Sequence, residues 1–119
     1  MAEYLIAFND DWVPELTLEE IEARTRGLRP LVAEMREAGV LIFTGGLDPD
    51  APIFNVVPQD GKTVMTDGPF IETKEHIGGF AVINADDAAQ AQYWAEKIAL
   101  ACGWPQQVHR FQPHREVSE

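Results

Sequence analysis

The chain has 119 residues, of which 45 % are hydrophobic, and it carries 20 acidic but only 9 basic side chains, so its formal net charge is −11. This size and composition predict one globular domain with a single core. The acidic surface repels phosphate groups, which argues against nucleic acid and anionic membranes as partners. The N-terminus has no basic segment followed by a long apolar run. Since no stretch approaches the length of a membrane span, we expect a cytoplasmic and soluble protein.

The first elements in chain order are a strand and a helix. Residues 4–8 are mostly apolar and precede three polar residues, which is typical of a strand followed by a turn. Thr17 and Glu20 have the spacing of a capping box, so we expect a helix to begin there. Its apolar face is predicted from spacings of three, four and seven and comprises Leu18, Ile21, Leu28, Leu31, Met35 and Ala38.

Glycine and proline interrupt and end this first helix. Gly27 and Pro30 lie within the helical pattern, where proline removes a backbone donor, so we expect a kink or a break. Gly39 is placed to end the second half of the helix. The apolar residues 40–43 then predict the second strand.

The middle of the chain carries the clearest hairpin signal. Residues 54–57 and 63–65 are strand-like and flank the dipeptide Asp60-Gly61, which favours a tight turn. The loop before this hairpin contains Asp48 and Asp50, but two acids separated by proline are weak evidence for a cation site.

The last part of the chain predicts a strand, a helix and a final strand. Residues 79–84 form an apolar core strand, and Asp86 and Asp87 are placed to begin the helix that Gly103 ends. Residues 107–111 predict the last strand. The buried stripe of the helix is predicted to be Ala91, Trp94, Ala95, Ile98 and Cys102.

This order of elements predicts an α+β fold in which an antiparallel sheet carries both helices on one face. The other face of the sheet would then be bare. Four aromatic side chains supply more apolar surface than one helical layer covers: Phe8, Phe43, Phe54 and Phe80. Because an apolar sheet of this size is normally hidden by a partner, we expect a homodimer that packs sheet against sheet.

The segment 66–80 is the most informative part of the chain. A turn at Asp67-Gly68-Pro69 is followed at once by four ionisable residues, and then by two glycines and a core strand. One interpretation is a solvated, charged strand end. The other is a small pocket whose polar groups are held by a stiff backbone. The ionisable residues are Glu72, Lys74, Glu75 and His76.

This segment resembles the DGPF subgroup of the YCII-related family. The matching residues are Thr66 to Phe70, Glu72, Lys74-Glu75 and Gly78-Gly79-Phe80. The resemblance extends over nearly the whole chain and implies one domain over residues 1–112, followed by a polar tail over 113–119. It also implies a ferredoxin-like subunit that forms a dimeric α/β barrel. A match over a fifteen-residue segment is a far more specific signal than a lone glycine fingerprint.

Relatives in the wider family include enzymes that act on small organic molecules, and these are associated with a His-Asp pair. This chain has no histidine between its first and second predicted strands, and Asp10 and Asp11 lack such a partner in the sequence. This departure speaks against a carried-over His-Asp mechanism.

Two classes of function follow from the motif. One is a module that binds a small organic metabolite in a pocket formed by the motif. The alternative is a lyase- or isomerase-like enzyme that uses a motif carboxylate as general acid or base, with Glu75, Asp67 and His76 as candidate catalytic residues. A purely structural role, in which these charges tie the loop to the sheet, stays open beside both. The candidate ligand-binding residues are Asp67, Phe70, Glu72, Lys74, Glu75 and Phe80.

We expect neither a cofactor nor a metal ion. The sequence contains no phosphate-binding loop, dinucleotide fingerprint, nucleophile elbow or metal-ligand motif. Cys102 is the only cysteine, so an intramolecular disulfide is excluded, and its helical position favours a buried apolar role over a reactive thiol.

Overall fold

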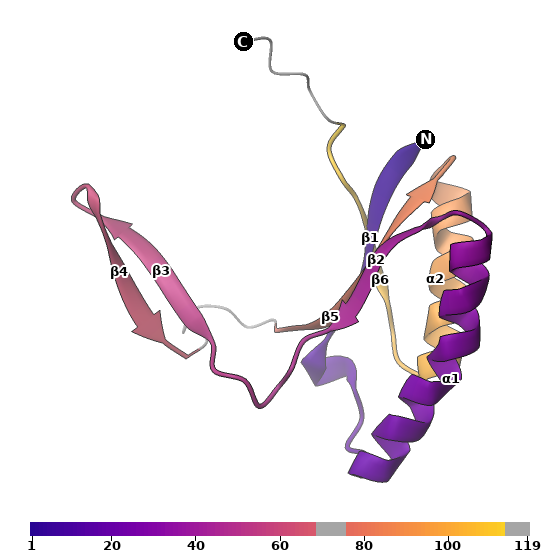
Figure 1. Cartoon of the computed structure of the whole chain (residues 1–119), viewed down its shortest axis with the longest axis horizontal. Coiled ribbons are helices and arrows are strands. Elements are labelled where there is room, and N and C mark those ends of the chain that lie inside the picture. Colours follow the sequence, from indigo (N-terminus) through magenta and orange to yellow (C-terminus); the bar gives the residue numbers. More distant parts are fainter. Residues whose placement is uncertain (69–75, 114–119) are drawn as a thin grey trace.

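The computed structural model describes residues 1–68 and 76–113 and contains a four-stranded antiparallel sheet (Figure 1). The strand order is β2-β5-β1-β6, in which the first strand of the chain lies between the third and the fourth strand of this sheet. With one helix between β1 and β2 and another between β5 and β6, this is the ferredoxin-like α+β arrangement that the sequence predicts. The strands are β1 (Ala2–Asn9), β2 (Leu41–Gly46), β5 (Ile77–Ala85) and β6 (Gln107–Arg110).

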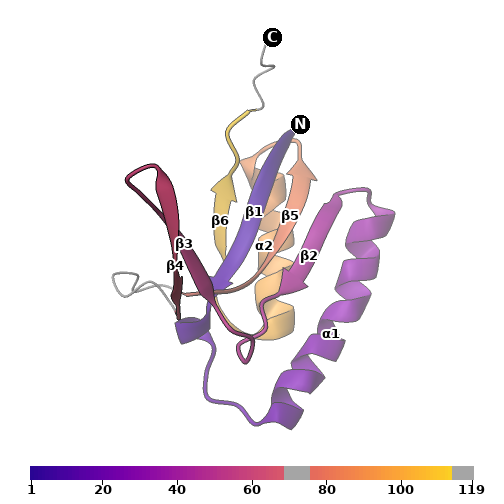
Figure 2. The same ribbon diagram turned by 60° about the vertical axis from the view of Figure 1, so that its left-hand side comes forward.

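Helices α1 (Leu18–Glu37) and α2 (Ala88–Cys102) cover one face of this sheet (Figures 1 and 2). Thr17 and Glu20 form the predicted capping box of α1, and Asp87 caps α2. Neither helix is long and apolar enough to cross a membrane in the part of the chain that the structure describes. The core between the helices and the sheet consists of Tyr4, Ile6, Leu31, Met35, Ile83, Ala85, Ala91, Trp94 and Ala95.

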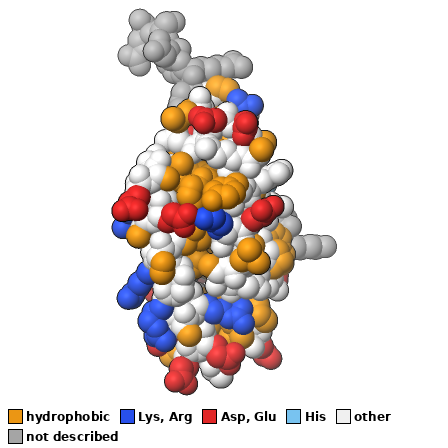
Figure 3. Space-filling model, turned by 90° about the vertical axis from the view of Figure 1, so that its right-hand side faces the viewer, with side chains coloured by type: hydrophobic (Ala, Val, Ile, Leu, Met, Phe, Trp, Pro, Cys, Tyr) orange, Lys and Arg blue, Asp and Glu red, His pale blue; other side chains and the backbone are white. Residues whose placement is uncertain are grey.

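The two helices are joined on their outer side by an ion pair. Lys97 Nζ lies 2.6 Å from Glu34 Oε1 and 5.0 Å from the centre of the Tyr93 ring. The hydrogen bonds to Glu34 and Tyr93 raise the pKa of Lys97 above its ordinary value of 10.5. Figure 3 shows this helical face, on which acidic, basic and hydrophobic side chains are interspersed.

Helix α1 is continuous through Pro30 and bends along its length in Figure 1, so the predicted interruption is a bend rather than a break. Its predicted apolar face is buried only in the second half, at Leu31 and Met35. In the first half, Leu18 is 74 % exposed and Ile21 is 38 % exposed. The spacing of apolar residues therefore predicts the helix correctly but overestimates the length that packs on the core.

A separate hairpin, β3 (Phe54–Gln59) and β4 (Lys62–Asp67), stands away from the sheet on the side opposite the helices (Figures 1 and 2). Asp60 and Gly61 both have positive φ angles, of 51° and 75°, as the predicted tight turn requires. The face of the hairpin formed by alternate residues carries exposed apolar side chains at Phe54, Val56 and Met65.

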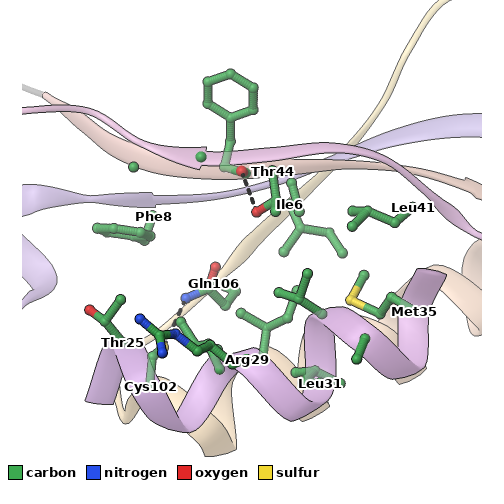
Figure 4. Close-up of a pocket in the computed structure, with 18 of the residues that line it drawn as sticks. Ile6, Phe8, Thr25, Arg29, Leu31, Met35, Leu41, Thr44, Cys102 and Gln106 are labelled. Atoms are coloured by element: carbon green, nitrogen blue, oxygen red, sulfur yellow. Dashed lines mark hydrogen bonds between the residues drawn. The ribbon is translucent and has the colours of Figure 1, made fainter. Parts of the chain in front are cut away.

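The sheet face opposite the helices is apolar, and no described part of the chain (residues 1–68 and 76–113) covers it. Phe43 packs against Phe80 with ring centres 5.9 Å apart, and Phe43 is 57 % exposed. Leu5 and Val82 are paired across β1 and β5 on the same face. Of the four aromatic residues counted as excess apolar surface, two lie away from this face, because Phe54 belongs to the hairpin and Phe8 points toward the helices (Figure 4).

Candidate functional site

The motif that dominates the sequence is only partly within the described residues. Asp67 is exposed at the end of β4, and His76 is half-buried just before β5. Phe80 lies in β5, where strand alternation and its contact with Phe43 place its side chain on the open sheet face. The other candidate residues, Phe70, Glu72, Lys74 and Glu75, lie outside the described residues.

The described ends of the motif are held by backbone contacts. The Gly68 amide donates to the Ile53 carbonyl at 2.8 Å, and the Asn55 side-chain amide donates to the Gly68 carbonyl. At the other end, the Asp10 amide donates to the His76 carbonyl at 2.8 Å. Asp10, which has no partner in the sequence pattern, is therefore brought next to the motif by the pairing of β1 with β5.

The absence of side chains at Gly78 and Gly79 is required by close packing against neighbouring groups. A Cβ atom at Gly79 would lie 2.8 Å from Phe8 Cε1 and 3.2 Å from the Gly45 carbonyl oxygen. A Cβ atom at Gly78 would collide with the Asp10 carboxylate and with the Phe8 ring. The glycine pair thus leaves room for the aromatic ring that lies at the end of β1 (residues 2–9).

Phe8 lines a cavity that the sequence pattern does not predict. This cavity has a volume of about 460 Å³ and lies between α1 and the sheet. In Figure 4, Ile6 and Leu41 extend from the sheet toward Leu31 and Met35 on α1, and these side chains enclose its apolar part. Further apolar lining comes from Phe8, Leu28, Val32, Ala33, Ala81, Ile98 and Trp104.

Polar groups gather at one end of this cavity. Figure 4 shows Thr25, Arg29, Cys102 and Gln106 close together at the end where Phe8 lies. The Gln106 amide donates to Cys102 Sγ at 3.4 Å and, at the same distance, to the Trp104 carbonyl oxygen. Cys102 is buried, as predicted for an apolar helical position.

Trp104 forms part of the wall at this polar end. Its ring lies 5.6 Å from the Phe8 ring, and the Arg24 guanidinium lies 5.8 Å above it. Arg24 Nη1 also donates to the Cys102 carbonyl at 2.9 Å, which ties α1 to the end of α2. The indole N–H of Trp104 is buried and has no hydrogen-bond partner among the described residues.

Sequence reasoning missed this cavity because each lining residue resembles an ordinary core or helix residue. Phe8 was counted only toward the apolar surface of the sheet, and the sequence gives no sign that its ring lines a cavity on the helical side. The one signal in the sequence is the arginine spacing, since Arg29 and Arg36 lie seven residues apart on the helix and both line the cavity. Among the described residues, no group of three or more His, Cys, Asp or Glu side chains is arranged to hold a metal ion.

Comparison with known proteins identifies the family but no activity. The YCII-related domain matches residues 5–102 of this chain. An uncharacterized protein of Rhizobium meliloti (strain 1021) is 31 % identical over 98 residues, which cover 82 % of this chain and 79 % of that protein. Since the domain match spans β1 to the end of α2, the chain belongs to the YCII-related family.

Proposed function

We propose that this protein binds a small organic metabolite in the cavity between α1 and the sheet. The observation that carries this proposal is the size and lining of the cavity. A volume of about 460 Å³ lies within the range of small-molecule sites, roughly 300 to 1,000 Å³. Apolar walls with a few polar groups at one end are also typical of such sites, because the walls bind the ligand body and the polar groups orient it.

The packing of the domain supports the same proposal. Protein interiors are normally packed to the density of organic crystals, and an unfilled apolar space lowers the stability of the fold. This cavity leaves about 460 Å³ between α1 and the sheet unfilled by side chains, and it is partly open to solvent. A ligand that occupies it would offset this cost and would raise the free energy of unfolding in proportion to the logarithm of its concentration.

The proposal is tested by filling the cavity from within. Val32 lines the cavity on α1, so Val32→Phe places a ring in the ligand's space. We expect fragments from a general library that bind the wild type, detected by ligand-observed NMR, to bind this variant at least about tenfold more weakly, which corresponds to about 1.4 kcal/mol. Ala23→Phe is the matched control, because Ala23 is exposed on the same helix and does not line the cavity. Equal fragment binding by both variants would show that the ligand site lies elsewhere.

The alternative that we propose is a lyase- or isomerase-like reaction at the motif, whose residues also underlie our proposal that the chain belongs to the DGPF subgroup. The observation that favours it is the backbone contact between Asp10 and His76, which brings a carboxylate-bearing residue to the described end of the motif. Glu75→Gln keeps the shape of the side chain and removes its charge. Under this alternative, the variant no longer binds library fragments that bind the wild type, while its melting temperature stays unchanged. A large fall in melting temperature alone would instead indicate a structural role for Glu75.

A further inference from the structure

We infer that the ligand of the cavity is a small organic acid, with an apolar body between α1 and the sheet and a carboxylate group beside Arg29. This inference rests on the proposed ligand site and adds the chemical class of the ligand. Three observations carry it: the charges that line the cavity, the position of Arg29, and an unsatisfied donor at the same end.

The charges that line the cavity are the reverse of those of the whole chain. The sequence has 20 acidic and 9 basic side chains, yet the described lining contains two arginines and no aspartate or glutamate. Neither Arg29 nor Arg36 forms an ion pair with a carboxylate among the residues that the structure describes. Both arginines are exposed, so they meet solvent at the edge of the cavity. In so acidic a chain, two cations at this edge without carboxylate partners favour an anionic ligand over a neutral or cationic one.

Arg29 is the better placed of the two arginines. Figure 4 shows it at the polar end of the cavity with Thr25 and Gln106, whereas Arg36 lies two helical turns further along α1, about 10 Å along the axis. Figure 3 shows basic side chains over the lower part of the helical face, where the first half of α1 runs. A guanidinium group binds a carboxylate through two parallel hydrogen bonds, so Arg29 fits the ligand class in geometry as well as in charge.

Trp104 supplies the independent observation at this end. Its indole N–H is buried and lacks a hydrogen-bond partner among the described residues, and Trp104 lines the cavity. An indole N–H is a donor only, so its missing partner is an acceptor. Native proteins rarely leave such a donor unsatisfied, because its desolvation is costly. A carboxylate oxygen beside Arg29 is an acceptor of the kind that this donor lacks, although the Trp94 indole N–H, which does not line the cavity, is buried and unpartnered in the same way.

The experiment compares three probes that share one apolar body and differ in charge: naphthylacetate, naphthylacetamide and naphthylethylamine. Binding is measured by titration calorimetry to the wild type, Arg29→Gln and Arg26→Gln. Arg26 is the matched control, because it is exposed on the same helix and does not line the cavity. We expect the wild type to bind the acid about tenfold more tightly than the amide and to bind the amine most weakly. Arg29→Gln should abolish the preference for the acid, and Arg26→Gln should keep it.

The outcomes separate the ligand class from the ligand site. If the acid and the amide bind the wild type equally and Val32→Phe weakens both, the inference of an acid is wrong while the proposed site stands. If Arg26→Gln reduces the preference as much as Arg29→Gln does, a general surface charge explains it and the inference is wrong. If Val32→Phe leaves the binding of all three probes unchanged, the proposed site itself is wrong. Trp104→Phe should weaken both the acid and the amide, since each offers an oxygen acceptor to the indole N–H.

Discussion

Gly79 shows how single residues fit the motif to the sheet. A Cβ atom at this position would lie 2.8 Å from the Phe8 ring, and the Gly45 carbonyl oxygen closes the other side at 3.2 Å. Because the neighbours include backbone and a ring that also lines the cavity, neither has room to move without disturbing β1, β2 or the cavity wall. A motif glycine that looks like a hinge in the sequence is therefore a packing requirement in the fold.

This requirement predicts the effect of Gly79→Ala. We expect it to lower the free energy of unfolding by about 1 to 3 kcal/mol, measured by urea denaturation, because the added methyl group overpacks the Phe8 contact. Gly27→Ala is the control, since a Cβ atom at Gly27 meets nothing within 4 Å and the position is inside α1. That change should raise the free energy of unfolding by roughly 0.5 to 1 kcal/mol. A Gly79→Ala variant as stable as the wild type would show that β5 does not pack on Phe8 in this way.

At the scale of elements, local signals predicted most helix and strand positions correctly. The capping box at Thr17 and the turn at Asp60-Gly61 each fix a boundary through contacts within four residues. Gly39 and Gly103 both have positive φ angles at helix ends, of 73° and 92°, as expected for glycines that end helices. Such signals can be recognised in the sequence because the residues that form each cap or turn lie close together along the chain.

The cavity was not predictable in the same way, because five elements of the fold meet to form it. Ile6, Leu28, Leu41 and Ile98 each fit the apolar pattern of their own strand or helix, and nothing in that pattern distinguishes a filled core from an open one. Whether this space is filled depends on how much of α1 packs against the sheet. Its first half is largely exposed, and this depends on long-range packing that no window of the sequence contains. For the motif, the sequence predicts the site residues, but most of them lie outside the described residues, so their arrangement stays a prediction.

At the scale of the whole molecule, two apolar surfaces are left uncovered by the residues that the structure describes. The first is the open sheet face with Leu5, Phe43 and Phe80, and the second is the hairpin face with Phe54 and Met65. A two-stranded hairpin is only marginally stable in water by itself, so an outlying hairpin with exposed apolar side chains favours a partner. The open sheet face and the hairpin both lie on the side of the molecule opposite the helices (Figure 1). A second copy offers the same two surfaces in return, as a two-fold interface requires.

We therefore propose a homodimer that packs through the open sheet faces, with each hairpin reaching toward the partner. Light scattering at micromolar concentration should give about twice the chain mass of 13.3 kDa. Phe43→Glu should convert the protein to a monomer, because it places a charge in the centre of an interface that must bury well over about 1,000 Å². Leu100→Glu is the matched control, since Leu100 is 86 % exposed on α2, on the helical side of the molecule, and this variant should stay dimeric. A wild-type mass near that of one chain, or dissociation by Leu100→Glu but not by Phe43→Glu, would contradict this interface. A dimer that Met65→Glu also weakens would place the hairpin within the interface.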